Sequence, residues 1–99
     1  MTNEKLIKII KYYGETNQKI KTVEELSELS VAITHDLAGK EDPENIIEEI
    51  ADVWVMMNQL IMIYGISEKL INKIADEKIQ RTLERMKNEN CNSWCINNT

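Results

Sequence analysis

The chain has 99 residues, which is enough for one domain with a modest core. Its formal net charge of −5 at pH 7 argues against electrostatic binding to nucleic acid, which requires a basic face. Three Gly, one Pro and no Phe, among many Ile, Leu, Glu and Lys, favour an all-α protein.

The sequence contains no candidate membrane span. The most apolar stretch, residues 50–64, is interrupted by Asp52, Asn58 and Gln59 and is shorter than the roughly 20 residues that a bilayer requires. The first five residues lack the basic region and apolar core of a signal peptide. We therefore expect a cytoplasmic protein with no membrane partner and no structural disulfide.

The first two predicted helices end at glycines. The first covers residues 3–13, where apolar side chains recur at helical spacing, and Gly14 ends it. The second starts near Thr16 and continues to Leu37, with Gly39 as its terminator. Such glycines are typical of helix C-termini, so the pattern predicts two helices in close succession.

The next two helices are predicted from their N-terminal caps. Asp42 and Pro43 supply an N-cap and a first-turn proline for a helix that ends before Gly65. Ser67 caps a fourth helix that reaches about residue 88. We therefore expect one domain over residues 1–88 and a disordered, Asn-rich tail over residues 89–99.

The third predicted helix is apolar on almost every side. A helix of this kind must be buried on most of its surface. Four helices from one short chain cannot surround it, so we expect a bundle completed by a homodimer or a homotetramer. The apolar residues are Val53, Trp54, Val55, Met56, Met57, Leu60, Ile61, Met62 and Ile63.

Carboxylates occur three residues apart on both the second and the third predicted helix. Glu25 and Glu28 share one helix face, and so do Glu49 and Asp52. On helical wheels each pair borders the most apolar arc, which we expect to face inward. These arcs comprise Leu26, Leu29, Ile33 and Leu37 on the second helix and Ile46, Ile50, Val53, Met57 and Leu60 on the third.

Packing of the two arcs would bring four carboxylates to one half-buried place, which requires a cation. Oxygen ligands suit Mg²⁺ or Mn²⁺. An acidic face that is simply solvated remains the alternative at this point. A di-iron site is disfavoured because its Glu-x-x-His motif is missing, and the one histidine, His35, is seven residues beyond Glu28.

Further polar residues extend the acidic stripe of the second helix. Gln18 and Lys21 precede Glu25 at helical spacing, and His35 follows Glu28. Such a line along the edge of a core suggests a ligand groove, although Lys21 can equally form an ordinary ion pair with Glu25.

At these residues the sequence resembles the all-α nucleoside triphosphate pyrophosphatases. That superfamily includes MazG-like proteins, dimeric dUTPases, dCTP pyrophosphatases and phosphoribosyl-ATP pyrophosphohydrolases. The resemblance covers residues 3–87 and depends on Glu24-Glu25-x-x-Glu28 followed by Glu49-x-x-Asp52. Tyr13-Gly14, Gln18 and Lys21 add a similarity to small single-domain MazG-like proteins.

The resemblance implies a Mg²⁺-dependent hydrolase that cleaves a nucleoside triphosphate between the α and β phosphates. It implies that Glu25, Glu28, Glu49 and Asp52 bind the metal. Glu24 and Glu25 would orient the attacking water or accept its proton.

Cations for the departing pyrophosphate are expected from two helices. Lys78, Arg81 and Arg85 share a face of the fourth helix, and the resemblance assigns them to the substrate together with Gln18 and Lys21. A solvated basic face is the alternative for the fourth helix. A competing function for the whole chain is a non-catalytic helical oligomerisation module.

Overall fold

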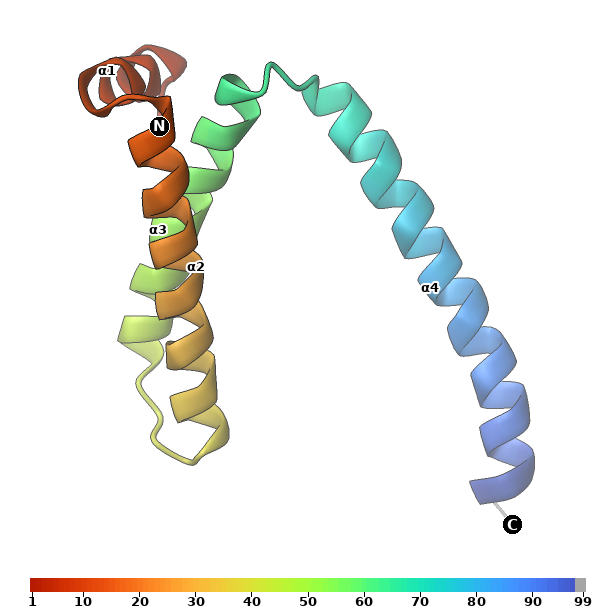
Figure 1. The fold of residues 1–99 in the computed structure, drawn as a ribbon. Coiled ribbons are helices and arrows are strands. Elements are labelled where there is room, and N and C mark those ends of the chain that lie inside the picture. The colour runs from red at the N-terminus through yellow and green to blue at the C-terminus, as the bar shows by residue number, and fades with distance from the viewer. Residues whose placement is uncertain (98–99) are drawn as a thin grey trace. The chain divides into compact units, whose positions relative to one another are not determined.

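The computed structural model describes the backbone of residues 1–97 and the side chains of residues 1–90. Four helices occupy almost all of this part of the chain (Figure 1). They are α1 (Asn3–Tyr13), α2 (Glu15–Leu37), α3 (Pro43–Ile63) and α4 (Glu68–Asn97). No strand occurs in residues 1–97, so the predicted all-α class is confirmed.

Three of the helices begin with a side-chain cap. The hydroxyl of Thr2 accepts a hydrogen bond from the backbone N–H of Lys5 at 3.4 Å, at the start of α1. The Asp42 carboxylate accepts the N–H of Asn45 at 3.2 Å before α3. These caps satisfy amide groups that the first helical turn leaves without partners, which explains why the helices begin where they do. The N–H of Leu70 bonds the Ser67 hydroxyl in the same way.

A single glycine separates α1 from α2. Gly14 has φ of 91° and ψ of 150°, and its N–H donates to the carbonyl of Ile10 at 2.8 Å. This conformation is essentially restricted to glycine. The predicted stop at Gly14 is therefore confirmed, and α2 starts at Glu15, one residue before the predicted position.

The end of α4 differs from the prediction. The helix continues past residue 88 as far as Asn97, over most of the predicted tail. The last two residues of that tail lie outside the described backbone. Cys91 and Cys95 lie outside the residues whose side chains are described.

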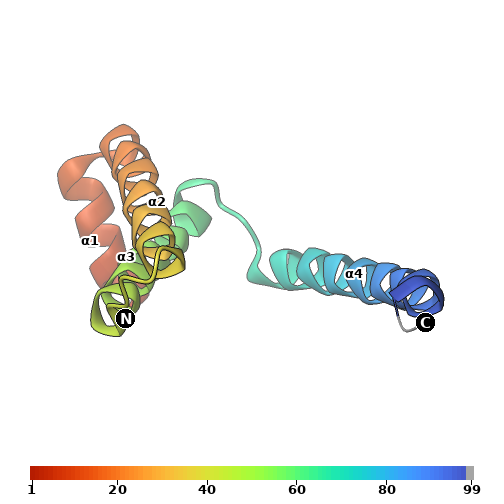
Figure 2. The same ribbon diagram turned by 90° about the horizontal axis from the view of Figure 1, so that it is seen from below.

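The chain divides into two compact units, Met1–Gly65 and Ile66–Thr99. In the first unit α2 and α3 lie side by side and antiparallel, and α1 packs against both near one end of the pair (Figures 1 and 2). The described part of the second unit is the single helix α4. None of the helices in the described residues is both long and apolar enough to cross a membrane.

The interface between α2 and α3 is more polar than the sequence suggested. Among residues 1–90, whose side chains are described, the buried apolar residues are Leu6, Ala32 and Met56. The buried polar or charged residues are Gln18, Thr22, Glu25 and Gln59. Three of these four lie on α2, so its buried face is the stripe that carries the carboxylates.

Five of the nine residues of the apolar arcs are exposed in the single chain, and the other four, Leu29, Ile46, Val53 and Leu60, are half-buried. Leu26 and Ile33 are close to half exposed, and Leu37 is 81% exposed. On α3, Ile50 and Met57 are exposed in the same way, as is Trp54. The prediction that the whole arcs face each other is therefore met only in part in the single chain, because the stripe with Gln18, Thr22 and Glu25 occupies the most buried position on α2.

Candidate metal centre

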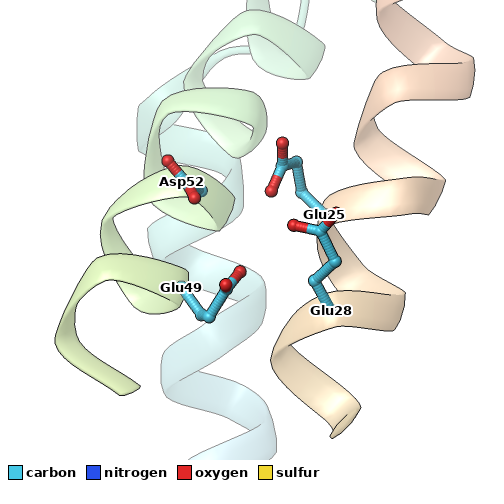
Figure 3. A group of neighbouring side chains, drawn as sticks. All are labelled: Glu25, Glu28, Glu49 and Asp52. Carbon is cyan, nitrogen blue, oxygen red and sulfur yellow. The ribbon is translucent and has the colours of Figure 1, made fainter. Parts of the chain in front are cut away.

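Four carboxylates from two helices meet in the first unit. Glu25 and Glu28 lie on α2, and Glu49 and Asp52 lie on α3 (Figure 3). One carboxylate oxygen from each residue lies within 4.8 Å of the others. The structure therefore brings together all four residues that the sequence pattern singled out as metal ligands.

Equal spacing on antiparallel helices explains this convergence. Each pair is separated by three residues, so each places two side chains on one face about one turn apart. When two such helices run antiparallel, Glu25 is opposite Asp52 and Glu28 is opposite Glu49. The sequence spacing and the direction of α3 together produce a single cluster.

Two carboxylate oxygens in the cluster lack a hydrogen-bond partner. They are Oε2 of Glu25 and Oε2 of Glu49, and both are buried. The Glu25 side chain is 8% exposed, and its other oxygen, Oε1, lies 3.1 Å from Nζ of Lys21. A buried carboxylate oxygen without a donor is costly, and a cation would remove that cost.

The neighbouring groups shift the pKa values of Glu28 and Lys21. The pKa of Glu28 is raised, first because its protonated carboxyl can hydrogen-bond Glu25 and next because of the negative charge of Glu25. Burial and the charge of Glu49 act in the same direction. The pKa of Lys21 is also raised, by its hydrogen bond to Glu25 and by the charge of that carboxylate. Lys21 thus places one positive charge beside the cluster.

The donor set fits a hard divalent cation. It consists of carboxylate oxygens, which suit Mg²⁺, Mn²⁺ and Ca²⁺ better than soft metals. His35 is not one of the four clustered residues. The residues present can therefore hold a metal ion, and they provide no imidazole of the kind that a di-iron centre uses.

Two hollows lie along α2, and the first of them borders the cluster. One, of about 300 Å³, is lined by Glu28, Glu49 and His35 among others. The second, of about 510 Å³, is lined by residues of α1, α2 and α3 that include Lys21 and Glu24. Space for a ligand therefore exists beside the carboxylates.

The other predicted site residues have different surroundings. Glu24 is exposed at the second hollow. Lys21 forms an ion pair with Glu25, which was the alternative to a role in ligand binding. Gln18 is buried and donates from Nε2 to Oε1 of Gln59 at 2.7 Å. The three basic residues of α4, Lys78, Arg81 and Arg85, are exposed in the second unit.

Sequence reasoning missed Gln59. This residue is 1% exposed and is the most deeply buried large side chain among the described residues. The sequence did carry a signal for it, a polar amide within the apolar stretch of α3. The sequence analysis used that amide only as an argument against a membrane-spanning helix. A polar residue within an apolar helix must find a partner, and that requirement could have linked it to Gln18.

Comparison of the chain with protein-family models, with curated proteins and with solved structures gives no match.

Proposed function

We propose that this protein is a Mg²⁺-dependent nucleoside triphosphate pyrophosphohydrolase of the MazG-like kind. The observation that supports it is the convergence of Glu25, Glu28, Glu49 and Asp52 within 4.8 Å, with two buried oxygens that lack donors. The motif resemblance connects this cluster to triphosphate chemistry. Mn²⁺ is an acceptable substitute because it also prefers oxygen ligands.

In the proposed reaction, water attacks the α-phosphorus and the bond from that phosphorus to the bridging oxygen breaks. Nucleoside monophosphate and pyrophosphate leave, and one proton is released. A bound cation would neutralise charge on the triphosphate and lower the pKa of a water molecule.

The residues of the chain have separate tasks in this proposal. The four clustered carboxylates hold the cation, and Glu25 is additionally fixed by Lys21. Glu24 is exposed at the second hollow and directly precedes Glu25 in the chain, and its proposed task is to orient a water molecule or accept its proton. We assign Gln18, Lys21, Lys78, Arg81 and Arg85 to substrate binding only as the resemblance implies.

The test is a panel of the common NTPs and dNTPs with Mg²⁺, assayed for monophosphate and pyrophosphate. Cleavage between the β and γ phosphates would give diphosphate and phosphate instead. In ¹⁸O-labelled water, attack at the α-phosphorus places the label in the monophosphate. The proposal predicts this labelling for at least one nucleotide.

Two neighbouring carboxylates on α3 provide a matched pair of variants. Glu49→Gln removes a cluster oxygen, whereas Glu48→Gln removes an exposed carboxylate outside the cluster. We expect Glu49→Gln to reduce turnover by about 100-fold or more, since even outer partners of metal ligands are worth about 10- to 100-fold. Glu48→Gln should stay close to the wild type.

Absence of turnover with every nucleotide, together with unchanged Mn²⁺ binding in Glu49→Gln, would refute the enzymatic proposal. Calorimetric titration with Mn²⁺ measures that binding independently of activity. The remaining candidate would then be the oligomerisation module.

The exposed apolar residues are the observation that favours this second candidate. On α2, apolar side chains recur at spacings of three and four residues, with Ser30 as the polar exception. On α3 a similar row is uninterrupted. The first row is Val23, Leu26, Ile33 and Leu37, and the second is Ile47, Ile50, Trp54 and Met57. Such spacing is typical of an interface between helices. Whether or not the protein is an enzyme, we propose that a second copy of the chain covers both rows.

A further inference from the structure

The resemblance assigns Gln18 to the substrate, but in the structure its side-chain amide is bonded to Gln59, and this buried contact takes no part in the proposed reaction steps. Gln18 on α2 is 6% exposed and Gln59 on α3 is 1% exposed. Nε2 of Gln18 donates to Oε1 of Gln59 at 2.7 Å. Among the residues with described side chains, this is the one side-chain hydrogen bond that joins two helices.

The amide pair and the carboxylates share one alignment of the helices. Gln18 lies seven residues before Glu25, and Gln59 lies seven residues after Asp52. On antiparallel helices these equal separations mean that the alignment that pairs the amides also pairs Glu25 with Asp52. Seven residues are about two turns, or about 10 Å along the axis, so the amides lie on the same faces as the acids.

The other buried residues of this interface do not define an alignment as strictly. Ala32 and Thr22 are small, and the Thr22 hydroxyl donates to the carbonyl of Gln18 on its own helix at 2.7 Å. Met56 is long and flexible, so it fills space in more than one arrangement. A hydrogen bond between two buried amides has a direction and a length, and buried polar pairs are known to set helix register.

We propose that the Gln18–Gln59 hydrogen bond is the positioning element that fixes α2 against α3 in the alignment at which the four carboxylates converge. A shift of one helix by a single turn moves it by about 5.4 Å. That distance exceeds the 4.8 Å within which the four carboxylate oxygens lie. The same shift leaves both amides buried without partners, so the amide pair excludes the alignments in which the cluster does not form.

The functional consequence of this inference rests on the proposed metal site, whereas the alignment itself is a property of the metal-free protein. The experiment therefore measures both. Gln18→Leu and Gln59→Leu are combined in one variant, which keeps the interface filled and removes both amides. Metal-free protein is examined by methyl NMR for contacts of the Thr22, Ala32 and Met56 methyl groups across the interface. Thermal unfolding is then recorded with and without Mn²⁺.

We expect the double variant to remain helical and to unfold no earlier than the wild type in the absence of metal. Its methyl contacts across the interface should become weaker and more numerous, as more than one alignment is populated. Most of the rise in Tm that Mn²⁺ gives the wild type should be lost. A purely structural role would lower metal-free stability and leave the response to Mn²⁺ intact.

The matched control is Thr22→Val, which removes a buried polar group that bonds only its own helix. It should keep the wild-type contacts of the Ala32 and Met56 methyl groups and the wild-type response to Mn²⁺. If the leucine variant does not fold, Gln18→Met with Gln59→Met replaces it, because methionine is closer in shape to glutamine.

A double variant with one unchanged set of methyl contacts and a full response to Mn²⁺ would overturn the inference. If the wild type itself shows no response to Mn²⁺, the proposed function fails and the methyl contacts alone decide this inference.

Discussion

Glu25 is the residue where opposing interactions in the candidate site meet. It is buried between α2 and α3, with one oxygen held by Lys21 and the other without a donor. Three further carboxylates lie within 4.8 Å of it. Without a cation such a cluster lowers the stability of the folded protein. The destabilising group of charges lies at the candidate metal site, as strained groups often do at functional sites.

Glu28 offers a test at the residue scale that needs no substrate. Its pKa is raised in the folded protein, so the folded state keeps the proton to a higher pH than the unfolded chain, in which glutamate titrates near about 4.3. The metal-free protein therefore loses stability as pH rises through this window. We expect metal-free Glu28→Gln to have a higher Tm than the wild type at pH 7, with the difference disappearing near pH 4.

A bound metal ion should reverse the order of the two Tm values. With saturating Mg²⁺ or Mn²⁺, the wild type should gain stability and Glu28→Gln should gain less, because one ligand is missing. Scanning calorimetry at both pH values, with and without EDTA, measures the effect. A variant that is less stable than the wild type in metal-free buffer at pH 7 would show that the carboxylates do not repel each other as described.

At the scale of elements, the turn between α1 and α2 depends on the backbone of Gly14. Its φ of 91° and ψ of 150° are unfavourable for any residue with a side chain, although a Cβ there would meet no atom within 4 Å. The cost of a substitution is therefore backbone strain alone. Gly65 also has positive φ, at 60°, but that value lies within the range of the left-handed helical region, which other residues enter more easily.

Two alanine variants separate these cases. Gly14→Ala should lower the free energy of unfolding by about 1–3 kcal/mol, the usual cost of a sparsely populated backbone conformation. Gly65→Ala should cost only about 1 kcal/mol, the lower end for left-handed backbone. Urea denaturation followed by circular dichroism measures both. A larger cost at Gly65 than at Gly14 would contradict the assignment of the Gly14 conformation.

At the scale of the whole molecule, the described part of a single chain buries very few apolar side chains. Of the apolar residues whose side chains are described, only Leu6, Ala32 and Met56 are buried, and α4 exposes Leu70 and Leu83. Burial of apolar surface is the main favourable term in folding. A second copy that covers the apolar rows of α2 and α3 would supply what the single chain lacks.

Ile33 on α2 tests this association. Ile33→Glu places a charge in the exposed apolar row, whereas Thr34→Glu places it one residue away, outside the row. Light scattering after size exclusion should give the wild type a mass of two or four chains of 11.5 kDa. We expect Ile33→Glu to shift the protein toward monomer and Thr34→Glu to leave it unchanged. A wild type that is monomeric and stably folded would contradict the proposed association.

Much of the fold was predictable because its signals are local. Gly14, Asp42, Pro43 and Ser67 act through their own backbone geometry or through bonds to nearby residues, so helix ends were predicted within one or two residues. The end of α4 was not, because the Asn-rich stretch after residue 88 carries no strong stop such as glycine or proline. The grouping of the four carboxylates was also predictable, since equal spacing on two helices is a property of the sequence.

The sequence by itself determined the helices, the spacing of the acids and the chemistry that four converging carboxylates allow. Only the tertiary structure decided which face of α2 meets α3. Hydrophobicity on a helical wheel ranks faces by their preference for leaving water, and it cannot tell which apolar surface the same chain will cover. In this fold the polar stripe with Gln18 and Glu25 is buried between the helices. The buried amide pair with Gln59 became visible only once the two helices were placed side by side.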